Sequence, residues 1–232
     1  MIDPAPHAPP PIARLAAIRE RIAAAARIAR AKPDDVTLIA ISKTHPAEAI
    51  TPLIAAGQRV FGENRVQEAQ AKWPELVAAH PDIRLHLVGQ LQSNKADDAV
   101  ALFDCIHSLD RPGLLTALAR AMDKSARQVP CFIQVNIGDE PQKGGCPIAD
   151  LPALIAQARD AAIPLAGLMC VPPAGIEAAP FFALLGKLAD DNGLSAGLSM
   201  GMSDDFETAI QLGATHVRVG SALFGARGVQ AV

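Results

Sequence analysis

The feature that most constrains the fold of this chain is a regular alternation of short apolar runs with longer stretches of helical periodicity. The runs lie at 36–42, 59–61, 84–89, 104–107, 131–137, 164–171, 197–201 and 216–220. The first of them, VTLIAIS, is apolar over nearly its whole length, which is typical of a strand buried on both faces. Eight such strands are therefore predicted, and each is followed by a helix.

The predicted helices lie between consecutive strands. They cover 46–56, 64–79, a stretch after Ser93, 112–124, 151–161, 180–192, 204–212 and 221–224, and an additional alanine-rich helix covers 12–31. Strands that alternate with helices form a parallel sheet, because parallel neighbours need a crossover connection. Eight units in about 200 residues match a single (β/α)8 TIM barrel with an extra N-terminal helix. A doubly wound open sheet is the alternative, although no G-x-G-x-x-G motif follows the first strand.

The composition bounds the domain organisation and the classes of partner. Residues 1–11 contain five prolines and are expected to be a disordered tail, and 12–232 to be one domain. The net charge of −3 gives no case for nucleic acid binding. No run is long enough for a membrane span, and no secretory signal opens the chain, so we expect a cytoplasmic protein. The four cysteines occur singly, which favours reduced thiols over a metal site.

Lys43 is the first candidate for chemistry, because it directly follows the first predicted strand. Functional groups of a barrel lie at the carboxyl ends of its strands. Partial burial of an amine there lowers its pKa and makes it a nucleophile. The alternative is a lysine that extends to solvent at the end of a strand.

Two glycine-containing segments, SMGMSDD and RVGSALFG, follow the last two strands. Ser203 and Ser221 each stand at the start of a predicted helix, where backbone N–H groups and a hydroxyl form an anion site. Phosphates commonly bind at these two loops of a barrel. Either loop alone is better explained structurally, with Ser203 as a helix cap or Gly220 as a tight turn. Together with Lys43 they indicate a phosphorylated carbonyl compound, either an aldolase substrate or pyridoxal phosphate (PLP). Arg218 shares a strand face with Gly220 and could meet a pyridine nitrogen.

Seven segments occur in an order that resembles one family. They are LIAISKTHPAEAI, FGENRVQEAQ, HLVGQLQSNK, IHSLDR, QVNIGDEPQKGG, GLMCVPP and GMSDDFETAIQLGATHVRVGSALFG. The chain from about residue 12 to 225 resembles the pyridoxal-phosphate homeostasis proteins, which have the barrel of the alanine racemase N-terminal domain. The resemblance implies a protein that buffers or delivers PLP without classical catalysis.

The resemblance also implies roles for individual residues. Lys43 would hold PLP as a Schiff base, and Arg218 would face the ring nitrogen. The phosphate would be held by Ser203, Gly220 and Ser221 with the backbone at Met202, and the ring would be lined by Asn64, His86 and Asn136. Arg65 departs from the family, which commonly has tyrosine there, and this affects only the rim of the site.

The residues independently favour a carrier over an enzyme. An arginine keeps its proton, so a ring nitrogen opposite it stays unprotonated and the cofactor is a weak electron sink. The chain contains no tyrosine, whereas racemases of this fold use a catalytic tyrosine and a second domain. The alternative function is a single-domain PLP-dependent racemase or a Schiff-base aldolase. We expect a monomer in transient contact with PLP-dependent apoenzymes.

The other polar residues near the strands are expected to have structural roles. His107 and His216 are predicted to be core or rim groups, and Glu63 and Glu68 to be surface or rim groups. The carboxylates of Asp204 and Asp205 are expected to point away from the phosphate, which has the same sign of charge.

Overall fold

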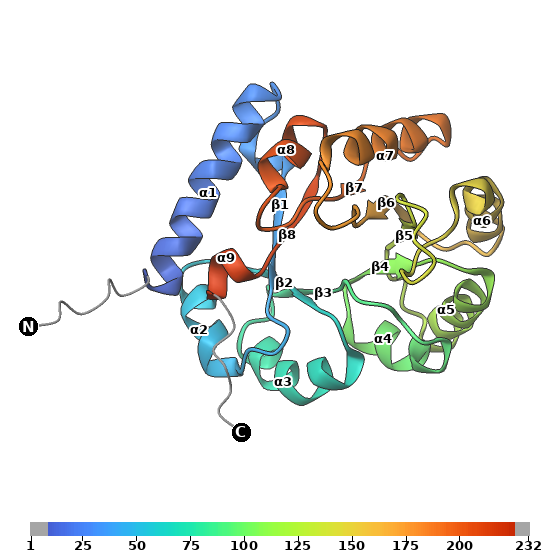
Figure 1. The fold of residues 1–232 in the computed structure, drawn as a ribbon. Coiled ribbons are helices and arrows are strands. Elements are labelled where there is room, and N and C mark those ends of the chain that lie inside the picture. The colour runs from blue at the N-terminus through green and yellow to red at the C-terminus, as the bar shows by residue number, and fades with distance from the viewer. Residues whose placement is uncertain (1–8, 226–232) are drawn as a thin grey trace, which may run out of the picture.

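The computed structural model describes residues 9–225, and within them eight parallel strands close into a barrel. The strands are β1 (Thr37–Ile41), β2 (Val60–Glu63), β3 (Arg84–Leu87), β4 (Cys105–Leu109), β5 (Cys131–Val135), β6 (Leu165–Cys170), β7 (Leu198–Ser199) and β8 (His216–Val219). Neighbours in sequence pair in parallel, and β8 closes the ring by pairing with β1 through Leu38 and Val217. The predicted barrel is therefore confirmed (Figure 1).

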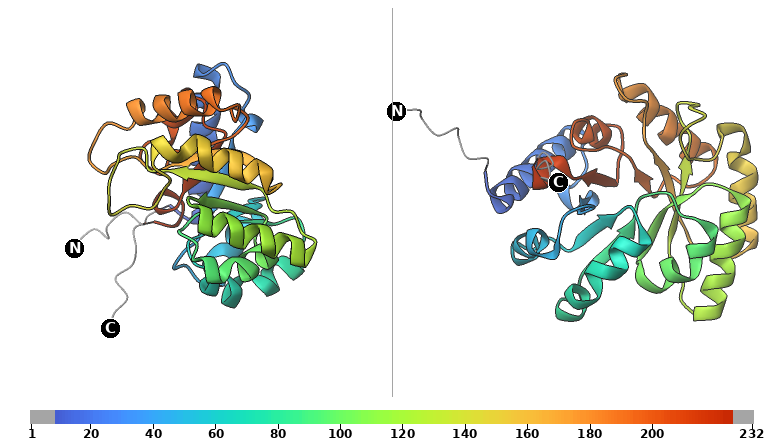
Figure 2. Two further views of the ribbon diagram at one scale, coloured as in Figure 1. Left: turned by 90° about the vertical axis from the view of Figure 1, so that its right-hand side faces the viewer. Right: turned by 60° about the horizontal axis from the view of Figure 1, so that its bottom comes forward.

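Helices follow the strands and form the outer layer (Figure 2). They are α2 (Ala47–Ala55), α3 (Val66–Ala79), α4 (Ala96–Leu102), α5 (Pro112–Ser125), α6 (Leu151–Asp160), α7 (Ala179–Asp191), α8 (Phe206–Gln211) and α9 (Ser221–Phe224). Short 3-10 turns, η1 (Pro33–Asp35), η2 (Ser93–Lys95) and η3 (Ile148–Asp150), precede β1, α4 and α6. Each crossover thus returns the chain to the same end of the barrel, and the carboxyl ends of the strands all lie at one mouth.

The additional helix α1 (Pro11–Ile28) packs against α8, α9 and α2 on the outside of the barrel (Figure 1). Its buried face consists of Leu15, Ile18, Ile22, Ala25 and Ala26. Arg21 makes a salt bridge of 2.7 Å to Glu207 of α8. Since α8 and α9 are short, α1 covers the part of the sheet that they leave open.

The start of α1 shortens the predicted tail by one residue. Pro11 opens the helix, one residue before the expected start, because proline at the first helical position has no N–H to leave unpaired. The remaining prediction of disorder concerns mainly residues 1–8, which lie outside the described residues. Within residues 9–225, none of the helices is long and apolar enough to cross a membrane.

The buried apolar residues form two clusters, one on the outer face of the sheet and one on its inner face. The main core fills the space between strands and helices and includes Trp73 and Phe61, whose ring centroids are 5.0 Å apart. The second cluster joins Cys105, Phe132 and Met169 from β4, β5 and β6. Along β4, β5 and β6 these three residues alternate with residues of the main core, so their side chains point into the barrel. They lie below the end of the barrel that carries the site.

Candidate functional site

A cavity of about 430 Å³ opens at the carboxyl ends of the strands. It is lined by Ile41, Lys43, Thr44, His45, Asn64, Val88, Val171, Met202, Ser203, Asp204, Arg218, Gly220, Ser221 and Gly225. These residues follow β1, β2, β3, β6, β7 and β8, apart from Ile41 and Arg218, which lie within their strands. Volumes of about 300–1,000 Å³ are usual for small-molecule sites, so the cavity suits a compact ligand.

Lys43 stands on a turn just beyond the end of β1. The N–H of His45 donates to the carbonyl of Ser42 over 3.1 Å, which closes the turn around Lys43 and Thr44. The His45 ring stacks on Phe224 of α9, with ring centroids 4.4 Å apart. Lys43 is half-buried, and among residues 9–225 no carboxylate forms a salt bridge with it. Its amine is thus available to a ligand in the cavity.

The loops after β7 and β8 meet at the part of the cavity wall next to the end of β1. The Ser221 hydroxyl donates to Ser203 Oγ over 3.0 Å, and the N–H of Ala222 donates to the same oxygen over 3.3 Å. The two predicted phosphate loops are therefore in direct contact. Asp204 is exposed and lines the cavity, and the direction of its carboxylate stays a prediction.

Asp205 differs from the expectation that its carboxylate points outward. Its Oδ1 accepts a hydrogen bond of 2.6 Å from the N–H of Met202, so the carboxylate turns back to the loop rather than outward. Asp205 stands just before the first residue of α8, and short acidic side chains there commonly accept from nearby N–H groups. The N–H of Met202 is consequently engaged by Asp205, whereas Ser203 and Ser221 line the cavity.

Arg218 forms the floor of the cavity. It is buried, and its two terminal nitrogens donate to Ser199 Oγ and to the carbonyl of Cys170, each over 2.8 Å. Burial lowers the pKa of Arg218, although a guanidinium stays protonated in proteins. In the part of the chain that the structure describes, no carboxylate forms a salt bridge with Arg218. The floor therefore carries a buried positive charge that neutral acceptors hold in place.

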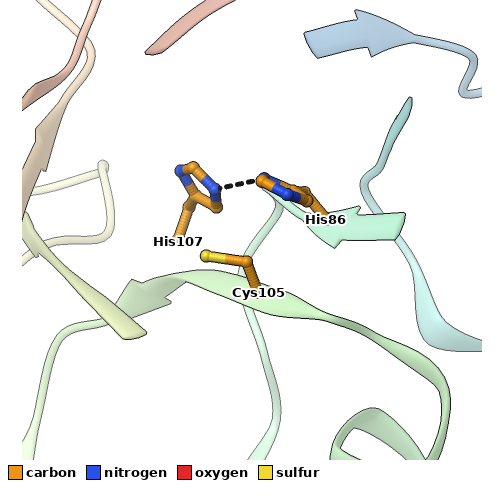
Figure 3. A group of neighbouring side chains, drawn as sticks. All are labelled: His86, Cys105 and His107. Carbon is orange, nitrogen blue, oxygen red and sulfur yellow. Dashed lines mark hydrogen bonds between the residues drawn. The ribbon is translucent and has the colours of Figure 1, made fainter. Parts of the chain in front are cut away.

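Three histidine rings gather inside the barrel beneath Arg218. His107 Nε2 lies 2.9 Å from His86 Nδ1 (Figure 3), and His107 Nδ1 lies 2.9 Å from Ser199 Oγ. Burial lowers the pKa of His86 to about 3 and that of His216 to about 4, and it places the pKa of His107 well below its usual value. The rings are therefore neutral, and the prediction that His107 is a core group is confirmed.

Cys105 completes this group of donors. Its thiol and the ring nitrogens of His86 and His107 lie within 4.8 Å of one another (Figure 3), a spacing that a metal ion can also use. Burial raises the pKa of the Cys105 thiol, and the residue packs with Phe132 and Met169. Since the histidines already bond each other and Ser199, the structure accounts for this cluster without an ion.

Seven of the nine predicted binding residues line the cavity, and two lie elsewhere. His86 belongs to the histidine network below the floor rather than to the cavity wall. Asn136 turns to its own loop, where its amide donates to the carbonyl of Glu140 over 3.0 Å and its oxygen accepts from the Glu140 N–H over 3.1 Å. Arg65 is exposed at the start of α3 and is outside the cavity lining, in agreement with a rim position.

The sequence did not reveal the polar network behind the Lys43 turn. Glu63 is 0% exposed, so the prediction of a surface or rim position is wrong. It accepts from Ser42 Oγ over 2.7 Å and from Trp73 Nε1 over 3.0 Å, and it pairs with Lys72 over 2.6 Å. Ser42 is 21 residues away in the chain and meets Glu63 through the pairing of β1 with β2, whereas Lys72 and Trp73 reach it from α3.

Comparisons with known proteins agree with this geometry. A family model described as "Alanine racemase, N-terminal domain" matches residues 13–228. A pyridoxal phosphate homeostasis protein of Pseudomonas aeruginosa is 42% identical over 218 residues, which cover 92% of this chain and 94% of that protein. PipY of Synechococcus elongatus, solved with PLP bound, is 41% identical with a TM-score of 0.82, covering 93% of this chain and 100% of PipY. The alanine racemase of Corynebacterium glutamicum (20% identity, TM-score 0.61, 94% of this chain and 63% of that one) shares the fold.

Proposed function

This chain belongs to the alanine racemase N-terminal domain family and, within it, to the pyridoxal phosphate homeostasis proteins, and we propose on this basis that its cavity holds PLP. The observation that carries the proposal is the convergence of Lys43, Arg218 and the paired hydroxyls of Ser203 and Ser221 on one cavity. An amine, a buried cation and an anion-binding loop pair are the groups that an aldehyde with a pyridine ring and a phosphate requires.

The cavity fits PLP on physical grounds. Lys43 and Arg218 bring two positive charges to its lining, and Asp204 brings one negative charge, so the site favours an anion. Arg218 lacks a carboxylate partner among the described residues, and a buried cation is stabilised by an electron-rich acceptor placed against it. The apolar side chains of Ile41, Val88 and Val171 supply the walls for a flat ring.

Different residues of the cavity would bind different parts of PLP. Bound PLP supplies an aldehyde that condenses with a primary amine, forming a C=N bond as the C=O bond breaks and one water leaves. Lys43 supplies the amine at the end of β1, and Arg218 donates toward the ring nitrogen without giving up its proton. Ser203, whose oxygen accepts from Ser221 and from the N–H of Ala222, would donate its hydroxyl to the phosphate, and Ser221 would do so by turning its hydroxyl away from Ser203. Asn64, which lines the cavity at the end of β2, would border the ring.

We infer that the protein is a carrier of PLP rather than an enzyme. A ring nitrogen that faces an arginine stays unprotonated, which weakens the electron withdrawal that transamination needs. The sequence has no tyrosine to act as a second base. The proposal includes a cytoplasmic monomer that passes PLP to apoenzymes in transient contacts.

Attachment at Lys43 is tested by reduction with borohydride. Wild-type protein mixed with PLP is expected to acquire a reduced adduct at Lys43, located by peptide mass spectrometry. Lys43→Ala is expected to lose the adduct and the absorption band of the attached cofactor. Lys124→Ala, which changes an exposed lysine on α5, is the control and should keep both. An adduct of undiminished yield in Lys43→Ala contradicts the assignment.

The carrier role is tested by proton exchange at the α-carbon of amino acids. Protein loaded with PLP is incubated in deuterium oxide with a panel of L- and D-amino acids, and α-deuterium is measured by mass spectrometry. A carrier gives no exchange above that of free PLP. Rapid exchange that is lost in Lys43→Ala means a single-base racemase, whereas carbon–carbon cleavage of a hydroxy amino acid means an aldolase.

A further inference from the structure

We propose that Lys72 of α3 is a positioning residue, which holds the backbone turn that presents Lys43 to PLP. The inference rests on the proposed attachment of PLP at Lys43. It concerns a lysine that lies outside the cavity lining and that contacts the turn from behind. Three observations support it: the conformation of the turn, the contacts of Lys72 and the burial of its charge partner.

The turn that carries Lys43 has a backbone conformation that its sequence disfavours. β1 ends at Ile41, so pairing within the sheet does not fix Lys43. Thr44, the next residue, has φ of 65°, in the left-handed region. A β-branched residue is a clear outlier there, and such strain persists only where the surroundings impose it. Something outside the turn must therefore hold it.

Lys72 and Glu68 supply that hold. Lys72 Nζ donates to the carbonyl of Ser42 over 2.8 Å and to the carbonyl of His45 over 3.0 Å, the two residues that bracket Lys43 and Thr44. The carboxylate of Glu68 accepts a short hydrogen bond from the N–H of Thr44. Both ends and the strained centre of the turn are thus bonded to side chains of α3.

The charge of Lys72 is matched by buried Glu63, at 2.6 Å. An ammonium has three hydrogens, and the carbonyls of Ser42 and His45 with Glu63 Oε1 account for all of them. The Lys72 side chain is 9% exposed and Glu63 is 0% exposed, so both charges are costly to bury. Apolar residues of similar size often stabilise a fold as well as a buried ion pair does. The buried pair is explained by its role in the turn: Glu63 holds the Lys72 ammonium where it orients the carbonyls of Ser42 and His45.

Lys72 acts through geometry, and its effect should appear in the attachment step. The reaction of the Lys43 amine with the aldehyde requires the nitrogen to approach the carbonyl carbon closely. A misplacement of about 1 Å costs about 10²-fold in rate. Binding of PLP before attachment depends on the loops after β7 and β8 and on Arg218, none of which Lys72 contacts.

The test uses two variants of the full-length protein. Lys72→Met removes the ammonium, and Glu63→Gln/Lys72→Met removes it without leaving an unpaired buried carboxylate. In the double variant the introduced amide oxygen can still accept from Ser42 and Trp73, so the loss is restricted to the turn and to the 3.7 Å pair of Lys72 with Glu68. Stopped-flow absorbance after mixing with PLP gives the rate of attachment. Equilibrium dialysis of PLP against the same variants in a Lys43→Ala background gives the affinity before attachment. Thermal denaturation gives the stability.

We expect both variants to attach PLP about 10- to 100-fold more slowly than wild type. Their affinity for PLP in the Lys43→Ala background should remain within about twofold. Lys124→Met, which breaks the exposed 2.7 Å pair with Asp97, is the matched control and should attach PLP at the wild-type rate. Wild-type attachment by the double variant overturns the proposal. A parallel loss of stability, affinity and rate overturns it as well, because this pattern marks a structural role.

These outcomes remain distinct from failure of the proposed function. If Lys43 does not carry PLP, wild-type protein forms no adduct on reduction and no variant is informative about rate. If Lys43 carries PLP but Lys72 does not position it, the adduct forms at equal rates in wild type and in the double variant. Conservative Lys72→Arg separates the cases further, since it keeps a buried cation with donors and should recover part of the rate.

Discussion

Ser199 is the residue through which the cavity floor and the histidine network are joined. Its hydroxyl oxygen accepts from Arg218 over 2.8 Å and also lies 2.9 Å from His107 Nδ1. A hydroxyl has one hydrogen to donate and two lone pairs that accept, and an arginine can only donate. With Arg218 as donor, Ser199 Oγ accepts from it, and the direction of the His107–Ser199 and His107–His86 bonds follows from the tautomer of His107. The guanidinium sets the direction of the Arg218–Ser199 bond.

Replacement of Ser199 tests this hydrogen-bond arrangement. Ser199→Ala leaves a buried guanidinium hydrogen and His107 Nδ1 without partners, and we expect the free energy of unfolding to fall by about 1–3 kcal/mol. Ser108→Ala is the control. Ser108 is also fully buried, but its hydroxyl has no hydrogen-bond partner in the structure, so stability should be unchanged or higher. Urea denaturation of both variants without PLP measures the free energy of unfolding. An equal loss of stability in the two variants contradicts this hydrogen-bond arrangement.

At the scale of elements, the loop between β7 and α8 depends on Gly201. Its φ is 92°, and a Cβ there would lie 2.6 Å from Cβ of Ala209 and 2.9 Å from Cα of Phe206. The carbonyl of Gly201 also accepts from the N–H of Arg218 over 2.9 Å. One glycine thus lets α8 pack closely, ends β7 early and sets the path of Met202 and Ser203 into the cavity.

Gly201→Ala should therefore affect both stability and phosphate binding. We expect a loss of at least about 1 kcal/mol in the free energy of unfolding, because alanine is strained at this φ and the contacts force α8 to move. The affinity for PLP should fall more than the affinity for pyridoxal, which lacks the phosphate. Gly186→Ala in α7 is the control: a Cβ there meets only Leu198 at 3.9 Å, and stability should rise by about 0.5–1 kcal/mol. Equal losses of affinity for both ligands would falsify the role of this loop.

At the scale of the whole molecule, the buried histidines make stability depend on pH. Burial lowers the pKa of His86 to about 3 and of His216 to about 4, whereas histidine in an unfolded chain titrates near about 6.5. Between these values the unfolded chain binds more protons than the folded one. Stability from these groups is therefore complete above about pH 6.5 and falls as the pH drops toward 4.

Each such histidine adds a slope of up to about 1.4 kcal/mol per pH unit within that window. Urea unfolding at a series of pH values between about 7 and about 4 should show the loss, and His86→Asn should reduce its slope. His80→Asn, at the end of α3 and outside the network, is the control and should leave the slope of wild type. The idea fails if His86→Asn and wild type have the same pH dependence.

The sequence by itself determined the barrel and the places where the site residues stand. The alternation of apolar runs and helical stretches is a local property, and Lys43, Ser203, Arg218 and Gly220 lie at or beside the ends of strands, so their convergence follows from a parallel closed sheet. The sequence could not place His86 and Asn136, because both residues satisfy their side chains with partners that residue type does not reveal.

Only the tertiary structure decided what holds the site residues in place. Lys72 meets the Ser42 carbonyl 30 residues away, Arg218 meets the Cys170 carbonyl 48 residues away, and His107 meets Ser199 92 residues away. Such contacts depend on strand register, on barrel closure and on how far each helix turns before it packs. A change of register by one residue exchanges the inward and outward faces of a strand. The sequence therefore predicts which residues face the ligand, and the closed barrel selects the buried residues that position them.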